Sequence, residues 1–474
     1  MVFDSFSFIY ICLVPAILLV LGLHKIGGKH KILLENIVLL MFSILFYYWS
    51  GGQYLTVLAV LIFVNYVVGL IGGSNKKLRW VLIMGVFFNI GLLIYYKYFE
   101  RIYDDLVDFK ILQSGNSLEK IVAPLGISFI IFECISYLMD LYQDHAKPTK
   151  NLLQFALYLS FFPKITQGPI VLYRDMEKEL RDRQIGYGEF VAGLERFIIG
   201  MSKKVLLGDI LSQTYTDKFY NMAEGMDAGT AWIVVFCYTL GLYMDFSGYS
   251  DMAIGMAKMF GFHFKENFNF PYLSTSITEF WRRWHISLGS WFKNYLYIPL
   301  GGSRKGNVYV NLFIVFLVTG IWHGAGSVYF LWGCLHGVCV VIERFIMKKD
   351  WYEKIPKVLK WAVTFTIVSL GWIAFNVSGH KELQMFAGYL VGIGKKSSFS
   401  AIYFLTPRLL TIWAVIILGT IICSRQKVQD LYRKLEQESL LFQIVKYLFL
   451  LGCLFLCYIT IVSEGYSPFL YFQF

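Results

Sequence analysis

The sequence has 474 residues, of which 57% are hydrophobic and only 16% are charged, and its mean hydropathy is +0.56. A soluble domain carries about 25% charged residues, so this composition excludes an ordinary soluble protein. The formal net charge of +11 does not by itself indicate nucleic-acid binding, because the cytoplasmic loops of membrane proteins are enriched in Lys and Arg.

The apolar residues are concentrated in runs that approach the length of about 20 residues needed to cross a bilayer. Backbone polar groups must be paired within such a segment, which predicts helices. The first run, residues 6–23, follows only Asp4 among charged residues and precedes no small-residue cleavage site, so we expect a retained first helix rather than a signal peptide. The later runs cover residues 37–49, 55–71, 81–96, 232–243, 312–321, 358–375, 409–422 and 447–462.

The charges of the loops predict an orientation. The loops at 24–31 and 76–79 are basic, the loop at 50–53 between them is neutral, and the stretch at 99–119 is acidic. Because loops rich in Lys and Arg stay in the cytoplasm, we expect the N-terminus outside. A basic stretch at 425–438 precedes the last run, so the C-terminus is expected outside as well.

The middle of the chain, residues 124–326, differs because charged residues interrupt its apolar runs. A charge at the bilayer centre costs roughly 2.5–3.5 kcal/mol, so such groups usually face protein or a water-filled cavity. Helix-breaking residues at 124–126 and 161–169 point the same way. Without internal repeats, we predict one domain over 1–474, an all-α bundle of about 10–12 membrane helices around a polar centre with broken helices. Asp245 and Asp251 flank a Ser-Gly-Tyr segment and are expected to be cap or turn residues rather than catalysts. The interrupting charges are Glu133, Asp140, Lys164, Lys203, Lys204, Asp245 and Asp251.

The densest polar segment is 278–305, where aromatic and cationic residues are interleaved. This mixture is typical of a helix in the membrane interface. It has two interpretations: an anchor helix without chemistry, or a cationic mouth that meets an anionic ligand from the cytoplasm. The residues concerned are Phe280, Trp281, Arg282, Arg283, Trp284, His285, Trp291, Lys293, Asn294, Arg304 and Lys305.

His323 is the main candidate for a catalytic base. It follows an apolar helical run and precedes Gly324, which predicts an imidazole well inside the membrane. A buried imidazole stays neutral and can take a proton from a hydroxyl group that attacks a thioester. The alternative is a hydrogen-bonded core histidine without chemistry. His336 is a weaker candidate, and the loops are expected to hold the remaining, solvated histidines, His24, His30, His145, His263 and His380.

The eight cysteines are scattered without a CxxC pair, and most lie in apolar runs. We interpret them as packing residues and expect neither disulfides nor a metal site.

Several short motifs follow one another along the chain. They are Pro-Leu-Gly-Ile-Ser-Phe (124–129), Phe-Pro-Lys (162–164), Gln-Gly-Pro (167–169), Asp-Phe-Ser-Gly-Tyr-Ser-Asp (245–251), Phe-Trp-Arg-Arg-Trp-His-Ile-Ser-Leu (280–288), Tyr-Ile-Pro-Leu-Gly-Gly (297–302) and Gly-Ile-Trp-His-Gly (320–324). With these motifs in this order, the sequence resembles the membrane-bound O-acyltransferase (MBOAT) family, in particular its bacterial alginate O-acetylation, peptidoglycan O-acetylation and teichoic-acid D-alanylation branches. The resemblance covers about residues 124–336 and the tail at 467–474.

The resemblance implies a ring of transmembrane helices around a funnel that narrows from both faces toward the catalytic histidine. It implies that His323 is the base and that His285 is the second motif histidine. Trp322 would wall the pocket. With acetyl-CoA as donor substrate, the phosphates would need charge-assisted contacts in the cationic segment; we assign them to Arg282, Arg283, Lys293 and Asn294. No bound cofactor is implied.

The function expected is therefore transfer of acetyl across a bacterial inner membrane to an extracytoplasmic protein or polysaccharide. The length and the tail favour acetyl-CoA over the alternative, a D-alanyl thioester on a carrier protein. A transporter or flippase would also explain charges at membrane depth, although paired repeats are not visible. A structural scaffold in an export complex is the remaining alternative. The acidic stretch at 99–119 and the C-terminal tail are the expected docking surfaces for an acceptor protein.

Overall fold

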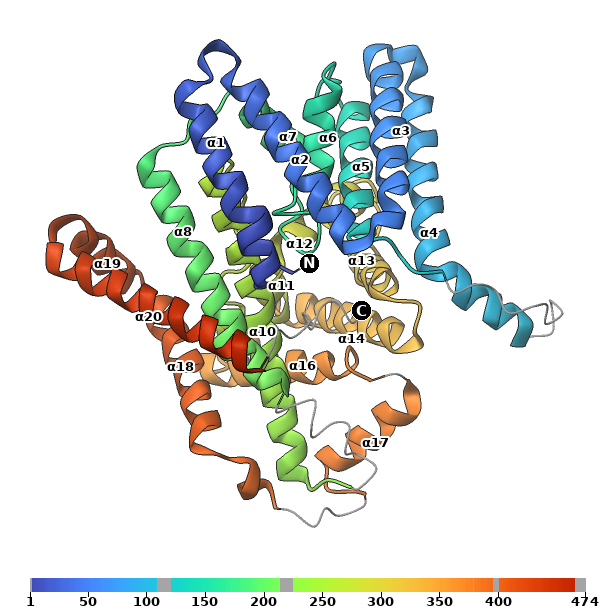
Figure 1. Cartoon of the computed structure of the whole chain (residues 1–474). Coiled ribbons are helices and arrows are strands. Elements are labelled where there is room, and N and C mark those ends of the chain that lie inside the picture. The colour runs from blue at the N-terminus through green and yellow to red at the C-terminus, as the bar shows by residue number, and fades with distance from the viewer. Residues whose placement is uncertain (1, 109–120, 214–224, 378, 395–399, 465–474) are drawn as a thin grey trace. The chain divides into compact units, whose positions relative to one another are not determined.

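The computed structural model describes residues 2–108, 121–213, 225–377, 379–394 and 400–464, and within these ranges the chain forms helices, turns and loops but no strand (Figure 1). The predicted docking surfaces fall largely outside these ranges, because residues 109–119 of the acidic stretch and the whole tail at 467–474 are not described. The chain divides into two compact units. Unit 1 comprises residues 1–197, 252–266 and 293–295, and unit 2 comprises 198–251, 267–292 and 296–474.

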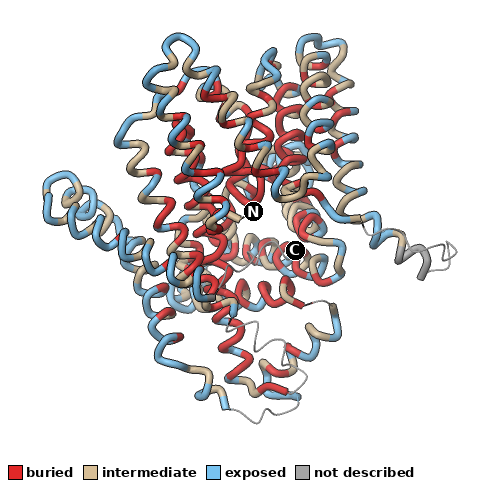
Figure 2. Tube along the Cα trace, in the orientation of Figure 1, coloured by how far each residue is buried: buried red, intermediate tan, exposed pale blue. Residues whose placement is uncertain are grey.

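Unit 1 is a bundle whose centre is α5, a helix buried along nearly its whole length (Figure 2). The helices α1 and α4 expose large apolar side chains instead, as expected of surfaces that face lipid. The helices of this unit are α1 (Val14–Ile26, after the π-helical turn Phe8–Leu13), α2 (Lys31–Gly51), α3 (Leu55–Ser74), α4 (Trp80–Asp108), α5 (Ile127–Tyr142), α6 (Leu152–Ser160), α7 (Tyr173–Arg181) and most of α8 (Tyr187–Ser202).

The predicted break at 161–169 is real: the chain between α6 and α7 is not helical, and every residue from 161 to 173 is buried. Gly126, which precedes α5, packs against this segment. Its φ of +65° is a left-handed conformation, and a Cβ there would lie 2.0 Å from the carbonyl oxygen of Ile165. Only glycine fits both constraints. The helix-breaking residues therefore allow irregular backbone inside the protein, where neighbouring groups surround it.

Unit 2 is built around residues 228–251 of the long helix α10 (Ala228–Met259), most of which is buried; the end of α10 belongs to unit 1. This corrects one expectation. Asp245 and Asp251 looked like turn or cap residues, but both lie inside α10, and Asp251 pairs with Lys203 at 2.6 Å. The other helices are the end of α8, the π-helical turn Lys203–Gly208, α11 (Ile277–Arg283), α12 (Ile286–Phe292), α13 (Val308–His323), α14 (Ser327–Ile346), α15 (Asp350–Glu353), α16 (Lys357–Ile373), α17 (His380–Leu390), α18 (Pro407–Cys423), α19 (Gln426–Glu438) and α20 (Leu440–Glu464).

Six helical segments of the described chain are long and apolar enough to cross a membrane, or seven if α18 and α19, bent by 85°, form one span. One of the six, Gly28–Ser74, contains α2 and α3, and each of these has the length of a span by itself. The protein is thus a polytopic, all-helical membrane protein. The segments are Phe8–Ile26, Gly28–Ser74, Lys76–Tyr103, Ala228–Met259, Ser327–Ile346 and Leu440–Ser463.

The segment 278–305 is not a single interfacial helix. It contains two helices of seven residues each, α11 and α12, separated at Trp284 and His285 and followed by the π-helical turn Lys293–Tyr297. Its aromatic residues are core residues: Phe280 is 1% exposed and Trp284 is 3% exposed. Burial of these rings in protein argues against the anchor-helix interpretation.

Candidate active site

The site in unit 2 begins with the tightly packed pair α13 and α14. Asn307 caps α13 by accepting hydrogen bonds from the backbone N–H groups of Tyr309 and Val310, at 3.0 and 3.4 Å. A Cβ on Gly320 would lie 2.9 Å from the Cα of Gly333, so glycines on both helices bring the two backbones together. This close packing fixes the end of α13, where His323 lies.

His323 is enclosed by aromatic rings and is only 6% exposed. Its ring centroid lies 4.8 Å from that of Trp322, 4.8 Å from that of Phe375 and 5.3 Å from that of Trp332. As the sequence predicts, the apolar run before His323 is helical, and it forms α13. Phe375 and Trp332, which also contact the His323 ring, were not identified from the sequence.

His285 lies in the turn between α11 and α12, with a φ of +44° and 2% exposure. Its Nδ1 is 3.1 Å from Oδ1 of Asn267, and its ring packs edge-on against Phe246 with centroids 4.9 Å apart. Burial lowers the pKa of His285 to about 3, so the imidazole is uncharged at neutral pH. The second predicted histidine is thus a fixed, neutral group.

A continuous series of aromatic contacts connects the two histidines. Trp284, next to His285, packs on Trp372 at 4.8 Å between centroids. Trp372 lies 5.6 Å from Phe375, which touches His323. Phe292, at the end of α12, lies 6.4 Å from Trp322, the neighbour of His323. Both histidines therefore belong to one aromatic cluster in unit 2.

The four residues predicted to bind the donor fall in two groups. Arg282 is exposed at the end of α11, and Arg283 pairs with Glu279 at 2.7 Å. Lys293 is exposed and Asn294 is half-buried, and both lie in the first part of the π-helical turn, residues 293–295, which belongs to unit 1. Within unit 1, Tyr295 of the same turn donates a hydrogen bond to Asp140 at 2.8 Å, and Arg174 donates to the same carboxylate at 3.0 Å. Asp140 therefore anchors this turn to α5.

His336 is a core residue next to the site. It is fully buried, and its Nδ1 accepts a hydrogen bond from the indole N–H of Trp281 at 3.4 Å. A Cβ on Gly371 would lie 2.7 Å from its Nε2, so the ring fills the space beside α16. These contacts favour a packing role for His336.

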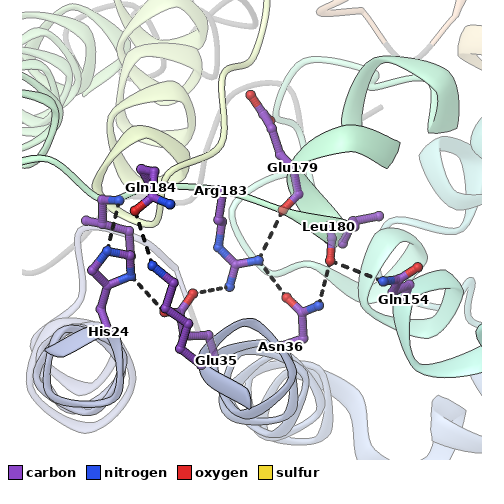
Figure 3. Close-up of polar contacts among 10 residues, drawn as sticks. His24, Glu35, Asn36, Gln154, Glu179, Leu180, Arg183 and Gln184 are labelled. Atoms are coloured by element: carbon purple, nitrogen blue, oxygen red, sulfur yellow. Dashed lines mark hydrogen bonds and ion pairs between the residues drawn. The ribbon is translucent and has the colours of Figure 1, made fainter. Parts of the chain in front are cut away.

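Unit 1 contains a polar network that the sequence did not reveal (Figure 3). Arg183 and Glu35 form a fully buried ion pair at 2.9 Å, and Arg183 also donates to Oδ1 of Asn36 at 2.6 Å. His24 was expected in a solvated loop, but it lies in α1 with Nδ1 at 2.8 Å from Glu35. The network ties α1 and α2 to the segment after α7, and its charges neutralise one another.

A second buried ion pair accounts for Glu133, which bonds to Lys164 rather than lining an open cavity. Among the residues that the structure describes, His, Cys, Asp and Glu side chains do not gather in groups of three that could hold a metal ion.

A sequence model of the membrane-bound O-acyltransferase family matches residues 44–378. The chain is 39% identical over 399 residues to the probable alginate O-acetylase AlgI of Pseudomonas putida, covering 81% of this chain and 79% of that protein. It is 34% identical over 396 residues to the peptidoglycan O-acetyltransferase of Helicobacter pylori, covering 76% and 74% of the two chains. It is 26% identical over 282 residues to the teichoic acid D-alanyltransferase of Bacillus subtilis, covering 56% of this chain and 71% of that protein.

Proposed function

Because this chain belongs to the membrane-bound O-acyltransferase family, and is therefore a multi-pass membrane acyltransferase, we propose that it passes acetyl from cytoplasmic acetyl-CoA to an extracytoplasmic acceptor. The acceptor is a secreted or periplasmic protein, or a cell-surface polysaccharide that becomes O-acetylated. The membrane is the bacterial inner membrane, with both termini outside, as the loop charges favour.

The observation that carries the proposal is His323 at the end of α13, enclosed by Trp322, Trp332 and Phe375. In the reaction, the imidazole takes the proton of the acceptor hydroxyl while the hydroxyl oxygen attacks the thioester carbonyl carbon. The carbon–sulfur bond breaks, the acetyl ester forms, and the departing thiolate receives the proton from the imidazolium. The atoms balance without a covalent enzyme intermediate. Holding both substrates beside the base supplies much of the rate enhancement.

Acetyl is favoured over D-alanyl by the likeness to relatives. The two relatives named for O-acetylation share 39% and 34% identity with this chain over about three quarters of its length or more, whereas the relative named for D-alanyl transfer shares 26% over 56%. Exposed Arg282 of unit 2 is suited to charge-assisted hydrogen bonds with the phosphates of acetyl-CoA. Membership of an acyltransferase family also argues against the transporter alternative.

The test uses purified protein in lipid vesicles, supplied either with radiolabelled acetyl-CoA or with a D-alanyl thioester of a carrier protein. We expect label on a hydroxyl-bearing oligosaccharide from acetyl-CoA alone. Label from the D-alanyl carrier alone would establish D-alanyl transfer as the function instead. In cells that carry the gene, mass spectrometry of surface polysaccharides should show ester-linked acetate that disappears when the gene is deleted.

A further inference from the structure

Asn267 holds three groups of the turn between α11 and α12 through one oxygen atom. Its Oδ1 accepts hydrogen bonds from the backbone N–H of Ser287 at 3.2 Å and from the hydroxyl of Ser287 at 2.9 Å, and it lies 3.1 Å from Nδ1 of His285. Its Nδ2 donates to the hydroxyl of Ser250 on α10 at 3.1 Å. Asn267 is 1% exposed, so these contacts are made inside the protein.

These contacts determine the tautomer of His285. The oxygen and nitrogen of an asparagine amide are normally hard to tell apart, but a backbone N–H can only donate. The amide atom that faces the N–H of Ser287 must therefore be oxygen. Because the same oxygen faces Nδ1 of His285, Nδ1 must carry the proton. Nε2 is then the nitrogen of the neutral ring that can accept a proton or a hydrogen bond.

The backbone of Asn267 holds the same turn. Its carbonyl accepts a hydrogen bond from the N–H of Ile286 at 2.9 Å, and the carbonyl of Arg283 accepts one from Asn269 at 2.9 Å. These bonds keep His285 in the left-handed region at φ +44°, which residues with a Cβ seldom adopt. A strained residue persists only where its surroundings over-determine it, and such residues cluster at active sites.

We infer that Asn267 is a positioning residue of the acyltransferase: it keeps the proton of His285 on Nδ1 so that Nε2 accepts a hydrogen bond from an O–H or N–H group of a substrate. The inference rests on the proposed function for the participation of His285 in acyl transfer. A buried, uncharged ring in one orientation is useful as an acceptor only if the proton is kept away from the accepting nitrogen.

The first test measures the tautomer without measuring activity. Solid-state ¹⁵N NMR of the whole protein in lipid, labelled at histidine, is compared with His285→Gln so that the signals of His285 are found by difference. We expect Nδ1 protonated and Nε2 unprotonated in the wild type, and a mixture of both tautomers in Asn267→Ala. A protonated Nε2 in the wild type, or an unchanged spectrum in Asn267→Ala, would overturn the inference.

The second test measures acetyl transfer. Loss of one hydrogen bond worth about 1.4 kcal/mol corresponds to about a tenfold change in an equilibrium, so kcat of Asn267→Ala should fall at least about tenfold, with KM for acetyl-CoA little changed. Asn267→Asp keeps the oxygen and should recover kcat, with the acid limb of the pH profile moved to higher pH because a carboxylate favours the imidazolium.

The matched control is Asn65→Ala, which removes another buried asparagine, one that bonds to Asn89 at 3.1 Å in unit 1. It should lower the melting temperature without changing the pH profile. Equal pH profiles and equal kcat per folded protein in wild type and Asn267→Ala would reduce Asn267 to a structural residue. Full transfer by His285→Ala would overturn the role of both residues, whereas absence of acetyl transfer by the wild type would refute the proposed function and leave the NMR result standing.

Discussion

Replacing Gly320 by alanine tests whether the close packing of α13 on α14 positions His323. The new Cβ would lie 2.5 Å from the carbonyl oxygen of Tyr329, whereas ordinary contacts begin at 3.4 Å. The helices must therefore separate by roughly 0.9 Å, because the opposing atoms belong to backbone, and overpacking of this kind costs about 1–3 kcal/mol. A displacement of about 1 Å can lower an enzymatic rate by about 10²-fold.

Gly419→Ala in α18 is the matched control, since a Cβ there has no atom within 4 Å. Replacing glycine by alanine raises the helix propensity of both variants by up to about 1 kcal/mol, so the difference between their melting temperatures isolates the cost of overpacking at Gly320. We expect Gly320→Ala to melt at a lower temperature than Gly419→Ala and to transfer acetyl at least about tenfold more slowly. Gly337→Ala should be intermediate, because its Cβ would meet the movable ring of Phe313 at 2.9 Å. Equal melting temperatures and rates for Gly320→Ala and Gly419→Ala would refute the reasoning.

Three further predictions concern other groups. The carboxylate of Glu343 accepts hydrogen bonds from the first two backbone N–H groups of α11 at 2.7 and 2.8 Å. Glu343→Ala should therefore lower the free energy of unfolding, measured by denaturant titration, by about 1–3 kcal/mol. An unchanged free energy of unfolding would argue against this cap. Lys164→Met should lower the free energy of unfolding by about 3–5 kcal/mol, because it leaves Glu133 buried without its cation. Adding Glu133→Leu should restore most of the lost free energy of unfolding, and a double variant less stable than the single one would contradict this. For His263, burial lowers the pKa, but the carboxylates of Glu179 and Glu189 outweigh it and raise the pKa overall. A raised pKa in the folded state means that stability is present below pH 6.5 and is lost as the pH rises through the folded pKa. The contribution of His263 to stability should therefore fall between pH 6 and pH 8, so the melting temperature of the wild type relative to that of His263→Gln should decrease over this interval. Identical pH dependences of the two melting temperatures would be the contrary result.

Much of the helical framework could be predicted from the sequence, because long apolar runs have few alternatives to helices in a membrane. The helix α13 is an example, because it covers the apolar run at 312–321 that the sequence predicts to be helical. The break inside 278–305 could not be predicted, because periodicity does not reveal a left-handed residue. Only the fold shows that His285 adopts φ +44°.

Partners distant in sequence are the second limit of sequence analysis. Glu35 and Arg183 form a buried pair although they lie far apart in the sequence. Asn267 is similar, because it lies in an unremarkable loop and gains its contact with His285 only when the chain folds back. The prediction of a turn at Asp245 was wrong for another reason. The nearby Ser-Gly pair suggests a turn, but burial within α10 keeps the helix continuous.

The most direct test of the account is acetyl transfer by His323→Ala in lipid vesicles, with wild type and His336→Ala measured beside it. We predict that His323→Ala keeps the melting temperature within a few degrees of the wild-type value but transfers no acetyl above background, while His336→Ala loses stability rather than the reaction. Wild-type rates of transfer by folded His323→Ala would contradict the role of His323 as the base.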